Sequence, residues 1–243
     1  MRAKNIVSIS LVLLVVISVI LYANTAFAQT MSSQLLTTDY AKQKIFKSDT
    51  VVIYPIFTQA AYGINGFYFY YSKLCNTKCL TVPIPTEKFP AYVSSEQAYL
   101  RLMSRSFDVL TDIDVDKNPG IIKVYKNVIV LHNEYVTKKE FEAITSHSNV
   151  IYLYPNALYT QVKVDYGTGQ VQLVRGHEYP LPTISNGFGW KFDNSRYEYN
   201  IQCSNSNFYR IANGWMLNCY PELVISNNTG LMDSLEEMVS LKA

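Results

Sequence analysis

Four polar side chains stand directly after the clearest buried-strand pattern of the chain. The pattern is Asn127–Leu131, and His132, Asn133, Glu134 and Tyr135 follow it. A histidine and a carboxylate this close could act as an acid–base pair or ligate a metal ion, and the tyrosine could orient a carbonyl group or bind ferric iron as a phenolate. The alternative is that Asn133 and Glu134 are loop and first-turn residues favoured by the dipole of the following helix. The sequence leaves both interpretations open.

Polar residues also end the next apolar segment. Val150–Leu153 runs into Tyr154 and Asn156, which we expect to bind substrate. Because the carboxyl ends of strands form the ligand crevice of open α/β sheets, both polar groups are predicted at the same edge of a sheet. A catalytic site there requires four side chains to converge in one pocket: His132, Glu134, Tyr154 and His177.

Three runs later in the chain carry further polar candidates. His177 lies in Arg175–Pro180 and could complete a metal, acid–base or substrate site, although a charged surface turn is the commoner structure for such a run. Asp193–Glu198 is predicted to serve structural hydrogen bonding, and Glu222 could face the same crevice as the first group.

An alternating acidic run resembles the start of a calcium loop. Asp112, Asp114 and Asp116 have the right spacing, but Lys117 and Lys123 stand where an EF-hand needs glycine and glutamate. We therefore expect a solvated acidic loop. The sequence also lacks G-x-G-x-x-G, a P-loop, H-E-x-x-H and G-x-S-x-G, which excludes the best-marked nucleotide, zinc-protease and serine-hydrolase sites.

Short apolar runs separated by helical patterns predict an α/β fold. Thr50–Phe57, Asn127–Leu131 and Val150–Leu153 are runs of the buried-strand type, and Thr137–Glu140 is a capping box that starts a helix between the last two. Helix-separated apolar strands at this spacing are typical of βαβ units in a parallel sheet.

Weaker patterns complete the prediction of secondary structure. Ser94–Gln97 is a second capping box, which we expect to start a helix that runs to about Arg105, and Phe107–Leu110 is a strand candidate. Gly66–Tyr71 is predicted to be extended. Alternating residues around the turn Tyr166–Gly169 indicate an added antiparallel β-hairpin, and the stripe of Leu231, Leu235, Met238 and Val239 indicates a C-terminal amphipathic helix.

The N-terminus has the pattern of a targeting segment. Arg2 and Lys4 precede an uncharged apolar stretch that ends in Ala26-Phe27-Ala28, so residues 1–28 are predicted to be a signal peptide, with an uncleaved membrane anchor as the alternative. Residues 29–49 read as a spacer and 50–243 as a single α/β domain. We expect the protein to be extracytoplasmic, either secreted or anchored at the cell surface, with membrane contact only through an uncleaved N-terminal segment.

Composition limits the possible partners. The chain has 243 residues, 49% of them hydrophobic and 16% charged, and 20 tyrosines. Its net charge of +2 comes from the leader, because removing Arg2 and Lys4 leaves 19 basic and 19 acidic residues. Such a balance excludes the basic footprint of a nucleic-acid-binding protein and favours a small molecule or a surface ligand as partner.

Four cysteines lie in the part predicted to be exported, where disulfides persist. We predict the pairs Cys75–Cys79 and Cys203–Cys219, because neighbours in sequence usually close local loops. A zinc site made of all four is the alternative, but the spacings do not match C-x2-C pairs.

Leu131-His132-Asn133-Glu134-Tyr135 after an apolar strand resembles the H-[DN]-E-Y motif of the large subunit of N,N-dimethylformamidases. The resemblance implies a flavodoxin-like, class I glutamine amidotransferase-like parallel sheet, without the nucleophilic cysteine of the amidotransferases. It also implies a mononuclear iron, or another divalent metal, held by tyrosine and glutamate oxygens, with His132, Glu134 and Tyr135 as matching catalytic positions and Glu134 and Tyr135 as metal ligands. The part after the leader further resembles a group of exported archaeal proteins.

Two functions from different classes fit these observations. The first is a metal-dependent, amidase-like hydrolase of C–N bonds, in which a metal or the His132/Glu134 pair activates water. The second is a non-catalytic extracytoplasmic binding or cell-surface protein on the same scaffold, because tyrosine-rich surfaces often serve recognition.

Overall fold

The computed structural model describes residues 48–86 and 94–240. The predicted leader, and all but the last two residues of the predicted spacer, lie outside the described residues. Within the described ranges, no helix is long and apolar enough to cross a membrane. The fold is α/β, and the predicted hairpin and C-terminal helix are both present.

The larger sheet of the described chain is mixed and has six strands. All neighbouring pairs are parallel except the last, in which the edge strand runs antiparallel to its neighbour. In spatial order the strands are β3 (Asp108–Thr111), β1 (Thr50–Tyr54), β4 (Asn127–Val130), β6 (Val150–Tyr152), β10 (Gly214–Leu217) and β9 (Phe208–Ile211). The three central strands are buried along their whole length, which explains their unbroken apolar sequences.

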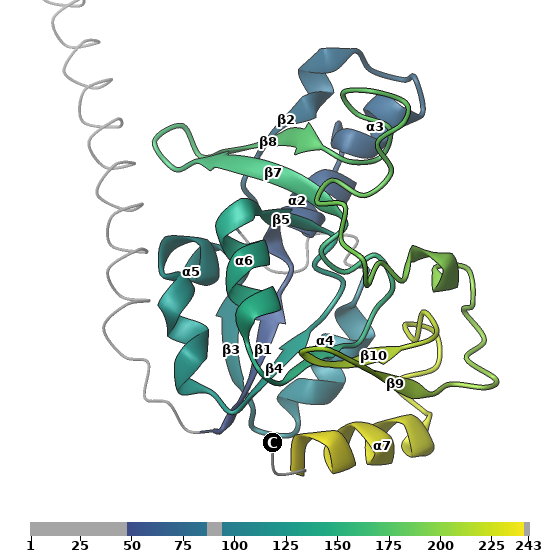
Figure 1. Ribbon diagram of the computed structural model, residues 1–243. Helices are drawn as coiled ribbons and strands as arrows, with labels where there is room; N and C mark the ends of the chain where they lie inside the picture. Colours follow the sequence, from purple (N-terminus) through teal and green to yellow (C-terminus); the bar gives the residue numbers. More distant parts are fainter. Residues whose placement is uncertain (1–47, 87–93, 241–243) are drawn as a thin grey trace, which may run out of the picture. The chain divides into compact units, whose positions relative to one another are not determined.

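Helices cover both faces of this sheet, as Figure 1 shows. Helices α4 (Glu96–Met103) and α7 (Thr229–Ser240) pack with Val52 and Ile129 in one apolar cluster. Helices α5 (Asp112–Lys117) and α6 (Lys138–Ser146), together with the 3-10 turn η2 (Pro119–Val124), pack with the alternate strand residues Val51 and Val128 in the other. Adjacent strand residues therefore point into two separate cores.

A second sheet of four strands lies beyond the carboxyl ends of β1 and β4 (Figure 1). Its order is β2 (Thr81–Pro83), β8 (Gln170–Arg175), β7 (Thr160–Asp165) and β5 (Tyr135–Thr137). The β7–β8 pair is the predicted antiparallel hairpin, and β5 joins it in parallel. Because β5 begins at Tyr135, the His132–Tyr135 turn is the direct connection between the two sheets.

The segment after β1 is helical where the sequence suggested extended chain. β1 ends at Tyr54, and the helix α2 (Ile56–Tyr62) begins after Pro55. The expectation that Gly66–Tyr71 is extended is wrong, since Phe67–Tyr71 forms the helix α3. Aromatic residues favour strands only where their side chains can pack on the surface of a sheet. The aromatic residues of α3 pack against α2 instead. Two 3-10 turns complete the described elements: η1 (Thr77–Leu80) and η3 (Ser195–Tyr197).

The acidic run is not a solvated loop, so that expectation is also wrong. It forms the helix α5, which Thr111 and Asp114 start with a complete capping box. Asp112 and Asp116 are buried. The capping box predicted at Ser94–Gln97 is absent, because Ser95 is the N-cap and makes no side-chain cap bond, although the helix α4 itself is confirmed.

Candidate functional site

The polar turn after β4 lies at the point where the strand order reverses. From β1 the chain moves outward to β3 and then returns past β1 to β4. In open α/β sheets, ligands bind in the crevice beyond the carboxyl ends of the two strands at such a reversal. Here α2 and α3 follow β1, and the His132–Tyr135 turn follows β4, so their side chains meet in that crevice.

Glu134 is the centre of this meeting point and is completely buried. The Tyr62 hydroxyl donates to its Oε2 at 2.8 Å, and the Tyr68 hydroxyl lies 3.2 Å from its Oε1. The two hydroxyl oxygens are themselves 2.9 Å apart. Nε2 of His177 contacts Oε1, and Nε2 of His132 lies 3.7 Å from Oε2. One carboxylate is thus surrounded by two phenols and two imidazoles.

Electrostatics keep this carboxylate ionised. Burial alone would raise the pKa of Glu134, but the hydrogen bond with His177 and the favourable interactions with the neighbouring imidazoles and with Tyr62 outweigh it and hold the pKa below the ordinary value. Burial and the charge of Glu134 raise the pKa of Tyr62 and of Tyr68, so both are neutral donors in the absence of a cation. Burial lowers the pKa of His132 against the pull of Glu134, which favours a neutral imidazole.

His132 is oriented from the side opposite Glu134. Its Nδ1 is hydrogen-bonded to the hydroxyl of Ser94, while its Nε2 has no hydrogen-bond partner among the described residues. His132 therefore leaves one buried ring nitrogen, Nε2, without a hydrogen bond to any described residue, 3.7 Å from Oε2 of the carboxylate.

A glycine allows the two tyrosine-bearing helices to approach. Gly66 lies between α2 and α3, and a Cβ at this position would lie 2.2 Å from the carbonyl oxygen of Ala61. No side chain fits at that distance. Gly66 therefore permits the spacing that brings Tyr62 and Tyr68 onto the same carboxylate.

His132, Glu134, Tyr154 and His177, which were predicted to converge in one pocket, lie near one another, but only His177 of the four lines the cavity. His132 and His177 both approach Glu134, and the ring centroids of His132 and Tyr154 are 5.8 Å apart. The Tyr154 hydroxyl bonds to Glu222 rather than to Glu134, at 2.5 Å. Glu222, which the sequence alone could not place, is thus bonded to a tyrosine whose ring lies next to His132.

The remaining predicted residues lie in or next to the site with different contacts. The ring of Tyr135 is buried and stacks on His177 with centroids 5.9 Å apart, but its hydroxyl makes no hydrogen bond to Glu134. Asn156 is buried, lines the adjoining cavity, and has no hydrogen-bond partner for Oδ1 among the described residues. His177 reaches the site from the run for which a charged surface turn was the commoner expectation, while Arg175, Glu178 and Pro180 of that run are exposed.

Three side chains of the site were not predicted as site residues: Tyr62, Tyr68 and Ser94. One sequence feature could have indicated Tyr68, namely the run of tyrosines within Gly66–Tyr71. If that run is a helix, its tyrosines point in different directions, and one of them can reach the site.

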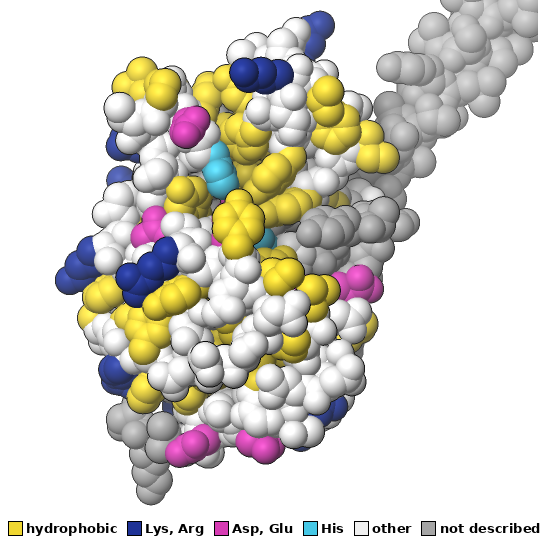
Figure 2. All heavy atoms as spheres, turned by 90° about the vertical axis from the view of Figure 1, so that its right-hand side faces the viewer, with side chains coloured by type: hydrophobic (Ala, Val, Ile, Leu, Met, Phe, Trp, Pro, Cys, Tyr) yellow, Lys and Arg dark blue, Asp and Glu magenta, His cyan; other side chains and the backbone are white. Residues whose placement is uncertain are grey.

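A large open cavity adjoins the buried carboxylate. Its volume is about 1060 Å³, and Tyr68 and His177 line it at the end where both contact Glu134. Figure 2 shows a histidine side chain at the surface among hydrophobic and aromatic side chains on the corresponding face. His177, whose side chain is 24% exposed, connects the cavity to the carboxylate.

A buried carboxyl group fixes the two loops that form the site. Asp112 accepts from the backbone N–H of Phe57 at 2.8 Å, and from the side chain of Asn133 in the turn after β4. Burial raises the pKa of Asp112 to about 6, and burial together with the charge of Asp112 raises the pKa of Glu140 on α6. Asp112, at the end of β3, therefore ties the loop after β1 to the turn after β4. Its burial, with the charge of Asp116 nearby, favours the protonated form.

We expect Glu140→Gln to stabilise the protein at high pH. Carboxyls with raised pKa bind more protons folded than unfolded, so stability falls as pH rises: Asp112 contributes from its ordinary value of 3.8 through about 6, and Glu140 contributes from its ordinary value of 4.5 upward, because its pKa is raised well above that value. Removing one acid should raise the free energy of unfolding by roughly 1–3 kcal/mol at pH 8 and change it little at pH 4. Urea unfolding at both values measures this, with the exposed Glu142→Gln on the same helix as control. A gain of equal size at both pH values would contradict the expectation.

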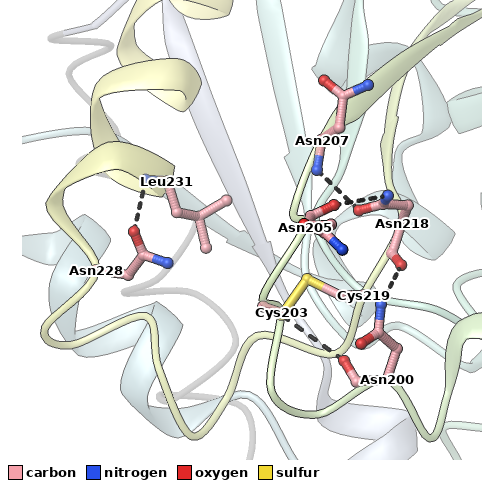
Figure 3. Close-up of a disulfide and its surroundings, with 8 residues drawn as sticks. All are labelled: Asn200, Cys203, Asn205, Asn207, Asn218, Cys219, Asn228 and Leu231. Carbon is pink, nitrogen blue, oxygen red and sulfur yellow. Dashed lines mark hydrogen bonds between the residues drawn. A yellow bond between two sulfur atoms is a disulfide. The ribbon is translucent and has the colours of Figure 1, made fainter.

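The disulfides are those predicted, Cys75–Cys79 and Cys203–Cys219. The first closes the loop after α3, at the rim of the cavity. The second joins the segment before β9 to the end of β10, and Figure 3 shows asparagines around it. Asn218 links its own side chain to the backbone of Asn205 and Asn207, and its carbonyl accepts from Asn200. These bonds hold the β9–β10 edge of the larger sheet.

No protein-family model and no curated protein matches this chain.

Proposed function

We propose that the protein is an extracytoplasmic, metal-dependent hydrolase of amide-type C–N bonds, built on a class I glutamine amidotransferase-like scaffold. The observation that carries the proposal is the buried, ionised Glu134 with the hydroxyls of Tyr62 and Tyr68 on its two oxygens. A structural carboxylate would be satisfied by one or two such donors, whereas this one also contacts His177 and has Nε2 of His132 3.7 Å away.

The spacing of these oxygens supports a cation between them. Ligand oxygens about 2 Å from a common ion and at right angles to one another lie about 2.8 Å apart. The distance between the Tyr62 hydroxyl and Glu134 is 2.8 Å, and that between the two hydroxyls is 2.9 Å. In the described part of the chain, no group of three or more His, Cys, Asp or Glu side chains is placed to hold a metal ion. A cation here would therefore depend on tyrosine oxygens.

Iron is the metal that this donor set suits best. Phenolate and carboxylate are hard oxygen donors, and the ligands would be Tyr62, Tyr68 and Glu134. The resemblance to the formamidase motif implied Glu134 and Tyr135 as metal ligands. The proposed set retains Glu134, but its tyrosine ligands are Tyr62 of α2 and Tyr68 of α3 instead of Tyr135. When bound, the ion would supply Lewis-acid activation of the amide carbonyl and of water.

The protein's own side chains have separate roles in this proposal. His177, partly exposed in the cavity and held by Glu134, takes a proton from the attacking water and returns it to the leaving amine. Asn156 lines the cavity, where its side-chain amide would bind the amide group of the substrate. His132 stays neutral and orients water or substrate beside Glu134.

Location outside the cytoplasm is supported by the two disulfides, since such bonds persist in oxidising compartments. It is also consistent with the leader pattern over residues 1–28 and with the balanced charge of the remaining chain.

Metal analysis of the purified protein tests the proposal directly. We expect stoichiometric iron and a visible absorption band from phenolate-to-iron charge transfer. Tyr62→Phe and Tyr68→Phe should each weaken or shift that band and lower the iron content about tenfold or more, because each removes one ligand. Tyr154→Phe is the matched control, since its hydroxyl bonds to Glu222 instead. A metal-free protein with an unchanged ability to bind ligands would favour the non-catalytic binding module.

A further inference from the structure

The walls of the cavity have an unusual composition for a small-molecule pocket. Five tyrosines line it, and Leu74 is the only aliphatic side chain among the described residues that do so. The tyrosines are Tyr68, Tyr70, Tyr71, Tyr159 and Tyr199. A pocket for an acyl chain or a lipid would present aliphatic walls. The ligand must therefore offer polar groups to the hydroxyls and a surface that packs on aromatic rings.

Charge on the walls is balanced. Lys73 and Arg196 supply two positive charges, and Glu178 and Glu198 supply two negative ones. A site for a polyanion such as a nucleotide needs an excess of positive charge. The cavity is thus suited to a ligand without net charge, which charged side chains of both signs can approach as hydrogen-bond donors and acceptors.

The backbone around the cavity disfavours an extended peptide. The lining residues come from α3, from η3 and from loops, and none of those described belongs to a strand. Peptides that bind by strand addition need an unpaired strand edge in the site. Amide and hydroxyl side chains of Asn76, Asn156, Ser185 and Ser195 alternate with the rings instead.

These features together match the chemistry of a sugar. A pyranose ring carries hydroxyls around its rim and C–H bonds on its faces, so it packs on the electron-rich face of a tyrosine while its rim bonds to amides, hydroxyls and charged groups. The volume of about 1060 Å³ is at the upper end of the range for small-molecule pockets and far exceeds a simple formamide. It can hold two or three sugar units.

We propose that this cavity binds a neutral oligosaccharide carrying N-acetyl groups, with one acetamido group directed at the Tyr68 and His177 end. This rests on the proposed function for the reaction itself. The oxygen of water bonds to the acetyl carbonyl carbon, the C–N bond breaks, and the proton passes to the amine nitrogen. The products are acetate and a free amino sugar, with no change in oxidation state.

Calorimetric titration with N,N′,N″-triacetylchitotriose tests the binding, with cellotriose as the sugar that lacks acetamido groups. We expect binding of the first and at least about tenfold weaker binding of the second. Tyr199→Ala, at a ring that is 85% exposed, should weaken binding of triacetylchitotriose about tenfold without affecting folding. Ile201→Ala, two residues away and outside the cavity lining, is the matched control.

Acetate release and iron content separate this inference from the proposed function. Hydrolysis of a simple anilide by the iron-loaded protein, with no binding of triacetylchitotriose, would overturn the sugar assignment and leave the hydrolase standing. Tight sugar binding by a protein that holds no metal and releases no acetate would overturn the hydrolytic step and keep the binding site. Equal binding of cellotriose would overturn the acetamido preference.

Discussion

Glu134→Gln is expected to remove the metal and to lower kcat/KM for amide hydrolysis by about 10³-fold or more. Glutamine has the shape of the carboxylate but no charge, and two neutral phenols with a neutral amide do not hold a cation. The same change removes the charged partner of His177, so the imidazole loses its orientation and its stabilisation as an acid.

Elemental analysis and initial rates measure this effect on one preparation. Glu222→Gln is the matched control, because Glu222 is also a carboxylate bonded to a tyrosine hydroxyl, but its partners are Tyr154 and the backbone of Gln97 instead of Tyr62 and Tyr68. It should retain its iron. Since the Glu134 side chain is buried and bonded on both oxygens, we expect the glutamine variant to lose on the order of 1–3 kcal/mol of stability and still fold. Stoichiometric iron in Glu134→Gln would refute the ligand assignment.

Gly214→Ala is expected to have the largest effect on stability. Gly214 starts β10 with φ +155°, and a Cβ there would lie 1.8 Å from the carbonyl oxygen of Val150, its partner on β6. The new methyl group cannot be accommodated without separating the two strands. We expect a loss of roughly 4 kcal/mol or more, since backbone strain and lost pairing add together.

Thermal unfolding should show a fall in Tm of about 10 °C for a domain of this size. Gly230→Ala is the control: it lies in α7, its nearest neighbour to an added Cβ is 3.7 Å away, and alanine favours helix there. A Tm for Gly214→Ala within about 2 °C of the wild type would show that β10 does not pair with β6 as described.

The central strands could be predicted because strands that are buried on both faces have continuous apolar sequences. Asn127–Val130 and Val150–Tyr152 are short apolar runs that no alternation interrupts, and both are strands of the parallel sheet. β10 gave no such signal: Gly214–Leu217 is short and lies in an asparagine-rich region. It enters the sheet through pairing with β6, more than 60 residues earlier, and only tertiary structure specifies that contact.

The candidate site was predictable where one turn contained it and not where distant segments supplied it. His132 and Glu134 follow a recognisable strand, so their position at its end follows from local pattern. Tyr62 and Tyr68 approach the carboxylate because Gly66 lets two helices meet, and a single sequence does not show which of 20 tyrosines does this. The prediction that Asp112 is solvated was wrong for a related reason. Its carboxylate accepts from the backbone N–H of Phe57 and from the side-chain amide of Asn133, and both residues are far from it along the chain.

The residues of the site come from segments that are far apart in the sequence, and this affects how the site is lost when the protein unfolds. Its contacts join Tyr62 to Glu134, Ser94 to His132 and His177 to Glu134, and so tie segments on either side of the central strands together. Detaching any one of these segments breaks the constellation even if the rest of the sheet persists. The site is therefore an all-or-none feature of this chain, present in the fully folded domain and lost with the first local opening that reaches it.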